Sequence, residues 1–419
     1  MNSYLRLSPI LNVLNNQIWL ILVLFILTVS LRLIFLETYW DNPSSLWDDE
    51  YDYVYLSKYI NEGGSWISET MPNSRPPLLS IILAPIAEYD PYVMRIYLVC
   101  LSSTSTIFLF LLSKILFPRH QTIWSLPSLI WAIYPPAIWY STLISTESLA
   151  SLMVLISVFT LIKTLNTNNK TYLSLCGIAI GLLILTRSSY VFIPFFLIGL
   201  SIMSTFLFKT KILSARQMVI IFAAVILITS PIIIRNYSTN GSFLPTESRL
   251  SYGLLLSNGD FESKKILDGG YDKTTDSMRI YSAAKNDNPN HREIRNMSFD
   301  IIVTEIQSHP RSIPIILSNR IVNFWGPRPD PFDINITIND IIMFAVWIPI
   351  LLCFASSVIC KNDLNYKVML IFIVYAFITT IGFWASPRFR FPVDSLIILS
   401  SILGLIRYSE MFQKRAVIV

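Results

Sequence analysis

The sequence predicts an all-α integral membrane protein with about ten transmembrane helices. Of its 419 residues, 53% are hydrophobic and only 14% are charged, whereas a soluble globular chain carries about 25% charged residues. Long apolar segments also recur along the chain, close to the roughly 20 residues that a helix needs to cross the hydrocarbon core. These segments are 18–36, 92–117, 122–141, 147–165, 171–187, 189–208, 217–235, 340–360, 367–385 and 391–408.

Three of these segments need comment. The first, 18–36, is too long for a signal-peptide apolar region and lacks a small-residue cleavage site, so we expect it to remain as the first helix. Pro135 and Pro136 predict a kink in the third segment. The segment 171–187 is short and closely followed by the next, which predicts a tight helical hairpin. The helix count around 171–208 therefore stays open.

Lysine and arginine residues in the short loops predict the orientation in the membrane. With ten spans and a cytoplasmic N-terminus, all of them fall on the cytoplasmic side, as the positive-inside rule requires. Both termini are then cytoplasmic. The basic residues concerned are Arg119, Lys163, Lys170, Lys209, Lys211, Arg216, Lys361, Lys367, Arg407, Lys414 and Arg415.

Two long segments then face the exoplasmic side. An N-terminal transmembrane module, 1–235, contains the first of them, 37–91, which is acidic. An exoplasmic loop domain, 236–338, follows, and a C-terminal transmembrane module, 339–419, ends the chain. Within the two loops, 77–87 and 313–325 are apolar but too short to span, which predicts interfacial amphipathic helices. The polar stretch 274–292 is expected to be a loop.

Composition also excludes several classes of function. The net charge of +5 does not indicate a nucleic-acid partner, because most basic residues outside the large loop flank apolar segments. The four cysteines lie within apolar segments and none has zinc-ligand spacing. Neither a disulfide framework nor a zinc finger is expected.

Three consecutive carboxylates, Asp48, Asp49 and Glu50, directly follow the first span. They have two interpretations: acids in the first turn of an interfacial helix, or a general base held close to the membrane. On a helix, Asp49 and Tyr53 share a face and Glu50 points elsewhere, so only one of the adjacent acids needs to address a substrate.

Arginines stand at the outer ends of several spans, where the positive-inside rule predicts few. Snorkelling, or pairing with a loop carboxylate, explains Arg32, Arg95 and Arg235 taken singly. Arg388 and Arg390 differ, because one aromatic separates them on a short outer turn. Such a pair suits a phosphate at the membrane surface, since guanidinium groups bind phosphate bidentately.

The order of these motifs resembles the polytopic glycosyltransferases of the C superfamily, specifically family 39. The resemblance is to the bacterial relatives of protein O-mannosyltransferases and of the lipid A aminoarabinose transferase. The resemblance depends on the shared order and on the common outer placement of the motifs. They are Asp49-Glu50 with Tyr53, Arg75-Pro76-Pro77-Leu78, Arg95, Tyr134-Pro135-Pro136, Thr146-Glu147, Leu185-Thr186-Arg187, Arg235-Asn236-Tyr237 and Arg388-Phe389-Arg390-Phe391-Pro392.

The resemblance implies a sugar donor linked to polyprenyl phosphate and an acceptor that meets it on the exoplasmic face of a bacterial inner membrane. Asp49 would be the catalytic base, with Glu50 beside it in substrate or metal contact. Arg388 and Arg390 would hold the lipid phosphate, helped by Arg75 and Arg187. Tyr53, Glu147 and Asp48 complete the expected substrate-binding set.

The chemistry of these residues agrees with that implication. Transfer to a hydroxyl or amine needs a base for the acceptor proton and positive charge for the departing phosphate. A single working carboxylate favours one inverting displacement. Asp49 and Glu50 could also hold Mg²⁺ or Mn²⁺, although nothing requires a cofactor. Besides membrane lipids, a glycan, a lipid and a protein all remain possible acceptors.

Two alternatives remain. A multi-span transporter or flippase of a lipid-linked or anionic substrate is the main one, but it would place its ionisable residues near the membrane midplane, usually within repeated halves. A polysaccharide polymerase or ligase would share the lipid-linked donor. It would be expected to carry a basic cluster in a large late loop, whereas this chain has an acidic first loop.

Overall fold

The computed structural model describes residues 7–47, 49–64, 75–208, 213–240, 243, 247–287, 291–327, 337–360 and 363–416, and all regular elements in these ranges are helices. Seven helical segments are long and apolar enough to cross a membrane, and two shorter apolar helices accompany them. The chain is therefore an all-helical, multi-span membrane protein. The seven segments are Gln17–Tyr39, Pro91–Leu116, Thr146–Thr167, Ala215–Ser238, Ile338–Cys360, Leu364–Ile381 and Pro387–Gln413.

The ten apolar segments of the sequence are helical for most of their length. The segment 122–141 is divided into α6 (Leu126–Ile133) and α7 (Pro135–Ser141). Tyr134 interrupts it with an extended backbone (φ −69°, ψ 116°), the conformation that a following proline favours. The two shorter apolar helices, α9 (Lys170–Thr186) and α10 (Ile193–Phe208), occupy the stretch predicted as a hairpin. However, α9 packs mainly against α8 (Thr146–Thr167) and α11 (Ala215–Asn240), and α10 packs against α11 and α18 (Leu364–Ile381). The count of ten crossings remains a prediction.

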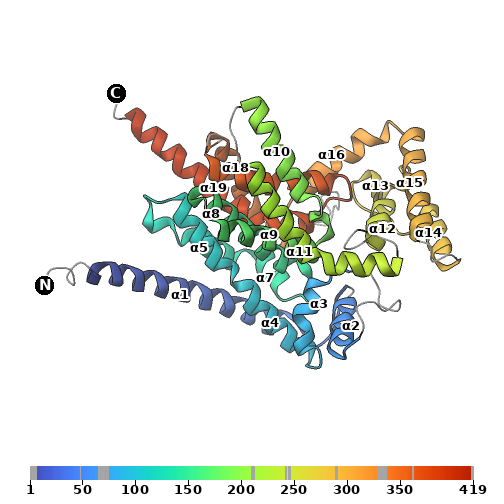
Figure 1. Cartoon of the computed structure of the whole chain (residues 1–419), viewed down its shortest axis with the longest axis horizontal. Coiled ribbons are helices and arrows are strands. Elements are labelled where there is room, and N and C mark those ends of the chain that lie inside the picture. The colour runs from blue at the N-terminus through green and yellow to red at the C-terminus, as the bar shows by residue number, and fades with distance from the viewer. Residues whose placement is uncertain are drawn as a thin grey trace.

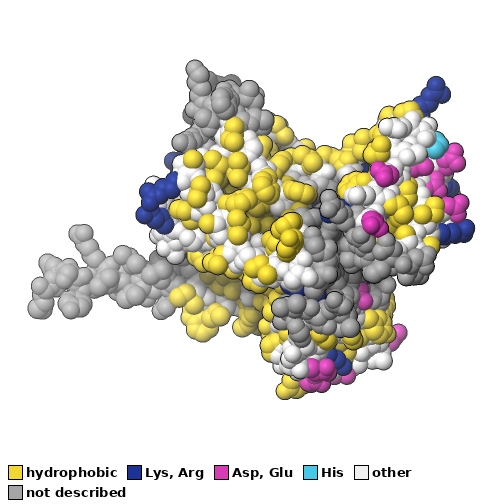
Figure 2. All heavy atoms as spheres, turned by 45° about the vertical axis from the view of Figure 1, so that its right-hand side comes forward, with side chains coloured by type: hydrophobic (Ala, Val, Ile, Leu, Met, Phe, Trp, Pro, Cys, Tyr) yellow, Lys and Arg dark blue, Asp and Glu magenta, His cyan; other side chains and the backbone are white. Residues whose placement is uncertain are grey.

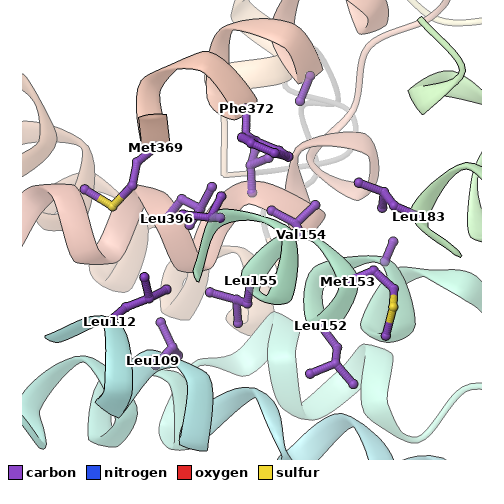
Figure 3. Packing of buried hydrophobic residues seen from close by; sticks show 14 of the residues in the cluster. Leu109, Leu112, Leu152, Met153, Val154, Leu155, Leu183, Met369, Phe372 and Leu396 are labelled. Atoms are coloured by element: carbon purple, nitrogen blue, oxygen red, sulfur yellow. The ribbon is translucent and has the colours of Figure 1, made fainter. Parts of the chain in front are cut away.

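Helix α8 (Thr146–Thr167) is the centre of the bundle. Its four consecutive residues Leu152, Met153, Val154 and Leu155 are all buried, so the helix is covered on every side. Figure 3 shows these side chains directed toward different neighbours. The neighbours are α5 (Ser105–Leu116), α9, α18 (Leu364–Ile381) and α19 (Pro387–Ala416).

Two glycines allow α9 to pack closely against α11 (Ala215–Asn240). A Cβ atom added to Gly177 would lie 2.6 Å from the Cβ of Ala224, and one added to Gly181 would lie 2.8 Å from the Cβ of Ile228. Small residues spaced four apart let helix backbones approach each other in membranes. This contact holds α11 beside the centre of the bundle.

The two ends of the bundle differ. The start of α1 (Leu7–Tyr39) and the end of α19 both lie on the left in Figure 1, whereas α2 (Asp49–Asn61) and the helices α12 to α15 lie toward the right. Figure 2 shows a broad hydrophobic face between the ends, with charged side chains concentrated toward them. An apolar band between two polar ends is what a bundle needs to cross a bilayer.

The chain between α1 and α4 (Pro91–Ser103) forms α2, α3 (Leu78–Leu83) and η2 (Ala84–Ile86). The described residues between α11 and α17 (Ile338–Ser356) form five helices, which we call the outer helical unit after the exoplasmic side that the sequence predicts for it. They are α12 (Glu247–Asn258), α13 (Lys264–Leu267), α14 (Asp276–Asp287), α15 (His291–Ser308) and α16 (Ser312–Trp325).

The expectation of a loop over 274–292 is wrong, because α14 occupies most of that stretch. Met278 and Tyr281 on α14 are buried against Leu255 and Leu256 of α12 and Ile294 of α15. Met278 and Tyr281, three residues apart, therefore supply the apolar contacts that hold this otherwise polar segment as a helix against α12 and α15. The stretches 77–87 and 313–325 are mainly helical, as predicted.

Candidate functional site

Three helices begin close together at one end of the bundle. Asp49 opens α2, Glu147 lies in the first turn of α8, and Arg388 follows Pro387 at the start of α19. Arg187, just after the end of α9, reaches the same place. Helix N-termini carry partial positive charge, which stabilises carboxylates in their first turns and favours anions in general.

These side chains form a continuous line of ion pairs. Arg388 Nη2 lies 3.1 Å from Oδ2 of Asp49, and its Nε donates to Oε1 of Glu147. Arg187 Nη1 lies 3.2 Å from the same Glu147 oxygen. At the other end, Arg75 donates to Oδ1 of Asp49. The line runs from Arg75 through Asp49, Arg388 and Glu147 to Arg187, and it joins four distant parts of the chain.

Exposure differs along this line. The side chain of Glu147 is 1% exposed, that of Asp49 is 26% exposed and that of Arg388 is 45% exposed. Oε2 of Glu147 is also buried and has no hydrogen-bond partner among the residues that the structure describes. A ligand arriving from outside would therefore meet Asp49 and Arg388 first, with Glu147 held beneath them.

Tyr53 lies behind the accessible end, on the face of α2 that also carries Asp49. The Arg75 guanidinium lies 5.4 Å from the centre of its ring. Burial raises the pKa of Tyr53, and the nearby Arg75 only partly offsets this, so the phenol stays neutral at physiological pH. Burial alone would lower the pKa of Arg75, but its hydrogen bond to Asp49 raises it above the usual value. Arg75 thus remains a cation beside Asp49.

Two members of the site were not predicted. Asp52 Oδ2 lies 2.8 Å from Arg75 Nε, and the ring of Phe389 lies 5.3 Å from the Arg187 guanidinium. The sequence contained a signal for each. Asp52 is one turn after Asp49 on the same helix, and Phe389 is the aromatic between the two arginines.

The structure places Glu50 outside this line of charges. Its carboxylate is buried and makes a bidentate pair with Arg95, at 2.8 Å to Nη1 and 2.7 Å to Nη2. It also accepts hydrogen bonds from the backbone N–H groups of Trp47 and Ile144, both at 2.8 Å. These contacts fasten the first outer loop to the bundle. They do not support the predicted contact of Glu50 with substrate or metal.

Arg390 is also directed away from the site. Its side chain is fully buried, and its Nε donates to Oδ1 of Asp394 at 2.8 Å. Its Nη1 donates to the carbonyls of Phe324 and Gly326 at the end of α16. The predicted phosphate contact of Arg390 does not fit this geometry, because residues two apart on a helix point in nearly opposite directions.

The predicted metal ligands are held by cations instead. Asp49 lies between Arg75 and Arg388, and Glu50 is paired with Arg95. Within the described ranges, no group of three or more His, Cys, Asp or Glu side chains is arranged to hold a metal ion. Asp48, the third predicted member of the acidic run, lies outside the described residues.

No protein-family profile and no curated protein sequence matches the chain. Solved structures match its fold. AglB, the archaeal oligosaccharyltransferase from Archaeoglobus fulgidus in complex with an inhibitory peptide and a dolichol-phosphate, matches 96% of this chain and 51% of its own, with 14% identity and a TM-score of 0.54. An oligosaccharyltransferase of the same organism, tethered to an acceptor peptide with an NVT sequon, matches 99% and 51%, with 14% identity and a TM-score of 0.58.

ArnT from Cupriavidus metallidurans, bound to undecaprenyl phosphate, matches 92% of this chain and 76% of its own, with 10% identity and a TM-score of 0.43. The chain thus spans about half the length of the two oligosaccharyltransferases. At 14% identity these two matches establish the fold alone, which this chain shares with the two oligosaccharyltransferases.

Proposed function

We propose that this chain is a membrane glycosyltransferase that moves a sugar from a polyprenyl-phosphate carrier to an acceptor on the exoplasmic face. The observation that carries the proposal is the accessible pair of Asp49 and Arg388, 3.1 Å apart at the outer helix ends. A carboxylate can take the proton of an acceptor hydroxyl or amine, and a guanidinium can hold a phosphate. The fold shared with oligosaccharyltransferases supports this assignment.

In the proposed reaction, the acceptor oxygen or nitrogen attacks the anomeric carbon while its proton passes to Asp49. The bond between that carbon and the phosphate oxygen breaks, and the phosphate leaves with the electron pair. A positioned base of this kind contributes about 10²–10⁴-fold in rate. Arg388 and Arg187 stabilise the charge that develops on the leaving phosphate.

The ion pairs suggest how the base becomes available. Arg388 and Arg75 bind different oxygens of Asp49. A donor phosphate that occupies Arg388 takes this guanidinium from Oδ2 of Asp49, the oxygen proposed to accept the acceptor proton. Arg75 continues to hold Oδ1 and thereby fixes the orientation of the carboxylate, and Tyr53 supports Arg75 from behind.

The stereochemical outcome follows from burial. A retaining mechanism would need a second carboxylate as nucleophile. Glu147 is 1% exposed and holds two guanidiniums, and Glu50 is buried against Arg95. The burial of Glu147 and Glu50 favours a single inverting displacement with Asp49 as the base.

We also propose a family and a membrane topology for this chain. The motifs resemble family 39, whose members use lipid-phosphate sugars, and the chain would reside in a bacterial inner membrane. Ten crossings with both termini in the cytoplasm agree with the common position of the start of α1 and the end of α19. The acceptor stays open among glycan, lipid and protein.

A transporter is less well supported. Secondary transporters bind their substrates near the midplane, between discontinuous helices. Here Asp49, Glu147 and Arg388 all lie in the first turns of helices at the outer end. That location suits chemistry at the membrane surface.

The test is complementation of cells that lack the protein, using the native chain, Asp49→Asn, or Asp41→Asn as a control. Asp41 is an exposed carboxylate of the same loop. Mass spectrometry would follow extracted polyprenyl-phosphate sugars and surface glycans. We expect Asp49→Asn to reach the membrane, to accumulate one lipid-linked sugar and to lose one surface sugar, whereas Asp41→Asn restores both. If Asp49→Asn restored both the lipid-linked sugar and the surface sugar to native levels, Asp49 would not be the base and the proposed function would be wrong.

A further inference from the structure

Arg390 is a buried charge that the proposed reaction does not use. It lies two residues after Arg388 on the first turn of α19, but it contacts a different set of groups. Arg388 reaches Asp49 and Glu147, whereas Arg390 reaches Asp394 and the end of α16. One helical turn therefore connects the candidate donor site with the outer helical unit.

The C-terminal end of α16 is held by side chains of the transmembrane bundle. Arg390 Nη1 donates to the carbonyl of Phe324 at 2.6 Å and to that of Gly326 at 2.7 Å. The carbonyl between them, that of Trp325, accepts the indole N–H of Trp347 at 2.7 Å. The last carbonyls of a helix have no partners within the helix, so these bonds satisfy groups that would otherwise be unpaired.

The same guanidinium is fixed from its other sides. It lies 3.6 Å from the centre of the Trp347 ring, and Asp394 accepts from its Nε at 2.8 Å. The second oxygen of Asp394 accepts the hydroxyl of Tyr134, also at 2.8 Å, at the break between α6 and α7. Arg390 thus joins α19 to α16, to α17 and to the α6–α7 break.

Stability alone does not account for such a group. A buried ion pair can often be replaced by apolar side chains at little cost, so its presence is better explained by the geometry that it imposes. The planar guanidinium donates in fixed directions, to a carboxylate and two carbonyls at once. This arrangement fixes the rotation of the first turn of α19 about its axis, and that rotation sets the direction of Arg388.

We propose that Arg390 is a positioning residue, which acts through Arg388 by holding that side chain toward Asp49 and Glu147. The inference rests on the proposed function, since it assigns Arg388 to the phosphate of the donor. It predicts that weakening the contacts of the Arg390 guanidinium also weakens phosphate binding, although Arg390 itself does not contact the phosphate.

The test measures the equilibrium binding of a short-chain polyprenyl monophosphate to the full chain in nanodiscs. Arg390→Lys keeps the positive charge, but the lysine cannot donate to the Asp394 carboxylate and to the carbonyls of Phe324 and Gly326 at the same time. We expect its Kd to rise about tenfold, since misplacement of a binding group by about 1 Å can cost up to about 10²-fold. Asp394→Asn loosens the same guanidinium more gently, and its Kd is expected to rise less in the same direction.

Arg320→Lys is the matched control. Arg320 is equally buried and also binds carbonyls, at 2.6 Å to Ser257 and 2.9 Å to Ile381, but it ties α16 to α12 and α18 and not to α19. We expect it to lower the melting temperature as Arg390→Lys does while leaving the Kd unchanged. An equal rise of the Kd in Arg320→Lys would show a general loosening of α16 and would overturn the positioning role.

Arg388→Gln separates this inference from the proposed function. If Arg388→Gln binds the phosphate as the native chain does, the proposed function fails. If Arg388→Gln loses binding and Arg390→Lys does not, only the positioning role is wrong. In the double variant, Arg390→Lys should add no further loss, because it acts through a side chain that is already gone. Additive losses would contradict the inference.

Discussion

Arg388 Nη2 lies 3.1 Å from Oδ2 of Asp49 and thereby joins the start of the last helix to the first outer loop. The same guanidinium donates from Nε to Glu147, so the Arg388 side chain forms ion pairs with two carboxylates on different helices. Asp49 and Glu147 thus occupy the positions on Arg388 that a phosphate would need. The carboxylates and a phosphate are therefore expected to compete for Arg388.

Glu147→Gln should change stability and affinity in opposite directions. Removal of the charge leaves Arg187 and Arg388 without their shared partner at a buried position, which costs about 3 kcal/mol of folding free energy. The freed guanidiniums should bind a short-chain polyprenyl monophosphate more tightly than in the native chain. Melting temperature and equilibrium binding would be measured on the same preparation. Glu88→Gln, at an exposed carboxylate, is the control and should leave both unchanged.

The adjacent acids Asp49 and Glu50 should behave differently on substitution. Glu50→Gln places an amide where the carboxylate binds Arg95 and two backbone N–H groups, so we expect a stability loss of about 3–5 kcal/mol. The Kd for the short-chain polyprenyl monophosphate should stay unchanged in the folded fraction. Asp49→Asn should abolish sugar transfer in complemented cells with little change in melting temperature. If Asp49→Asn destabilised the protein and Glu50→Gln only stopped transfer, the two roles would be reversed.

Two glycines in apolar helices should also respond with opposite signs. A Cβ on Gly177 would lie 2.6 Å from the carbonyl oxygen of Ile221, so α9 and α11 must move apart, and Gly177→Ala is expected to cost about 1–3 kcal/mol. Gly199 of α10 has no atom within 4 Å of the same position. Gly199→Ala should stabilise the protein slightly, because alanine favours helices by up to about 1 kcal/mol. Melting temperatures in detergent would distinguish the two.

The outer helical unit should show one acid-sensitive contact. Hydrogen bonds from the hydroxyl and N–H of Thr274 lower the pKa of Asp272 to about 2. The folded pKa is below the unfolded value of about 3.9, so this stabilisation is complete above about pH 4 and is lost as the pH falls through about 2. Asp272→Asn should lower the melting temperature at pH 7, and the difference from the native chain should shrink at pH 3. A difference that stays constant with pH would mean that folding does not shift the pKa of Asp272.

Several features of the site were predictable because they depend on position along a helix. Asp49, Glu147, Arg187 and Arg388 each stand at the outer end of an apolar segment, and those ends must meet at one membrane surface. Their proximity therefore follows from the order of spans and polar ends. The close packing of α9 and α11 could also have been predicted, since Gly177 and Gly181 form a small-residue motif that the hydropathy pattern conceals.

The sequence by itself determined the all-helical membrane fold and the collection of charged residues at one end of the bundle. Lipid requires long apolar helices and excludes charge from their middle, and both requirements are readable from composition and spacing. Only the tertiary structure decided which members of the Asp49-Glu50 and Arg388–Arg390 pairs face the site. Neighbouring residues on a helix point in different directions, and the rotation of α2 and α19 is set by contacts with Arg95 and with the end of α16. Those partners lie far away in the sequence, so no local pattern could reveal them.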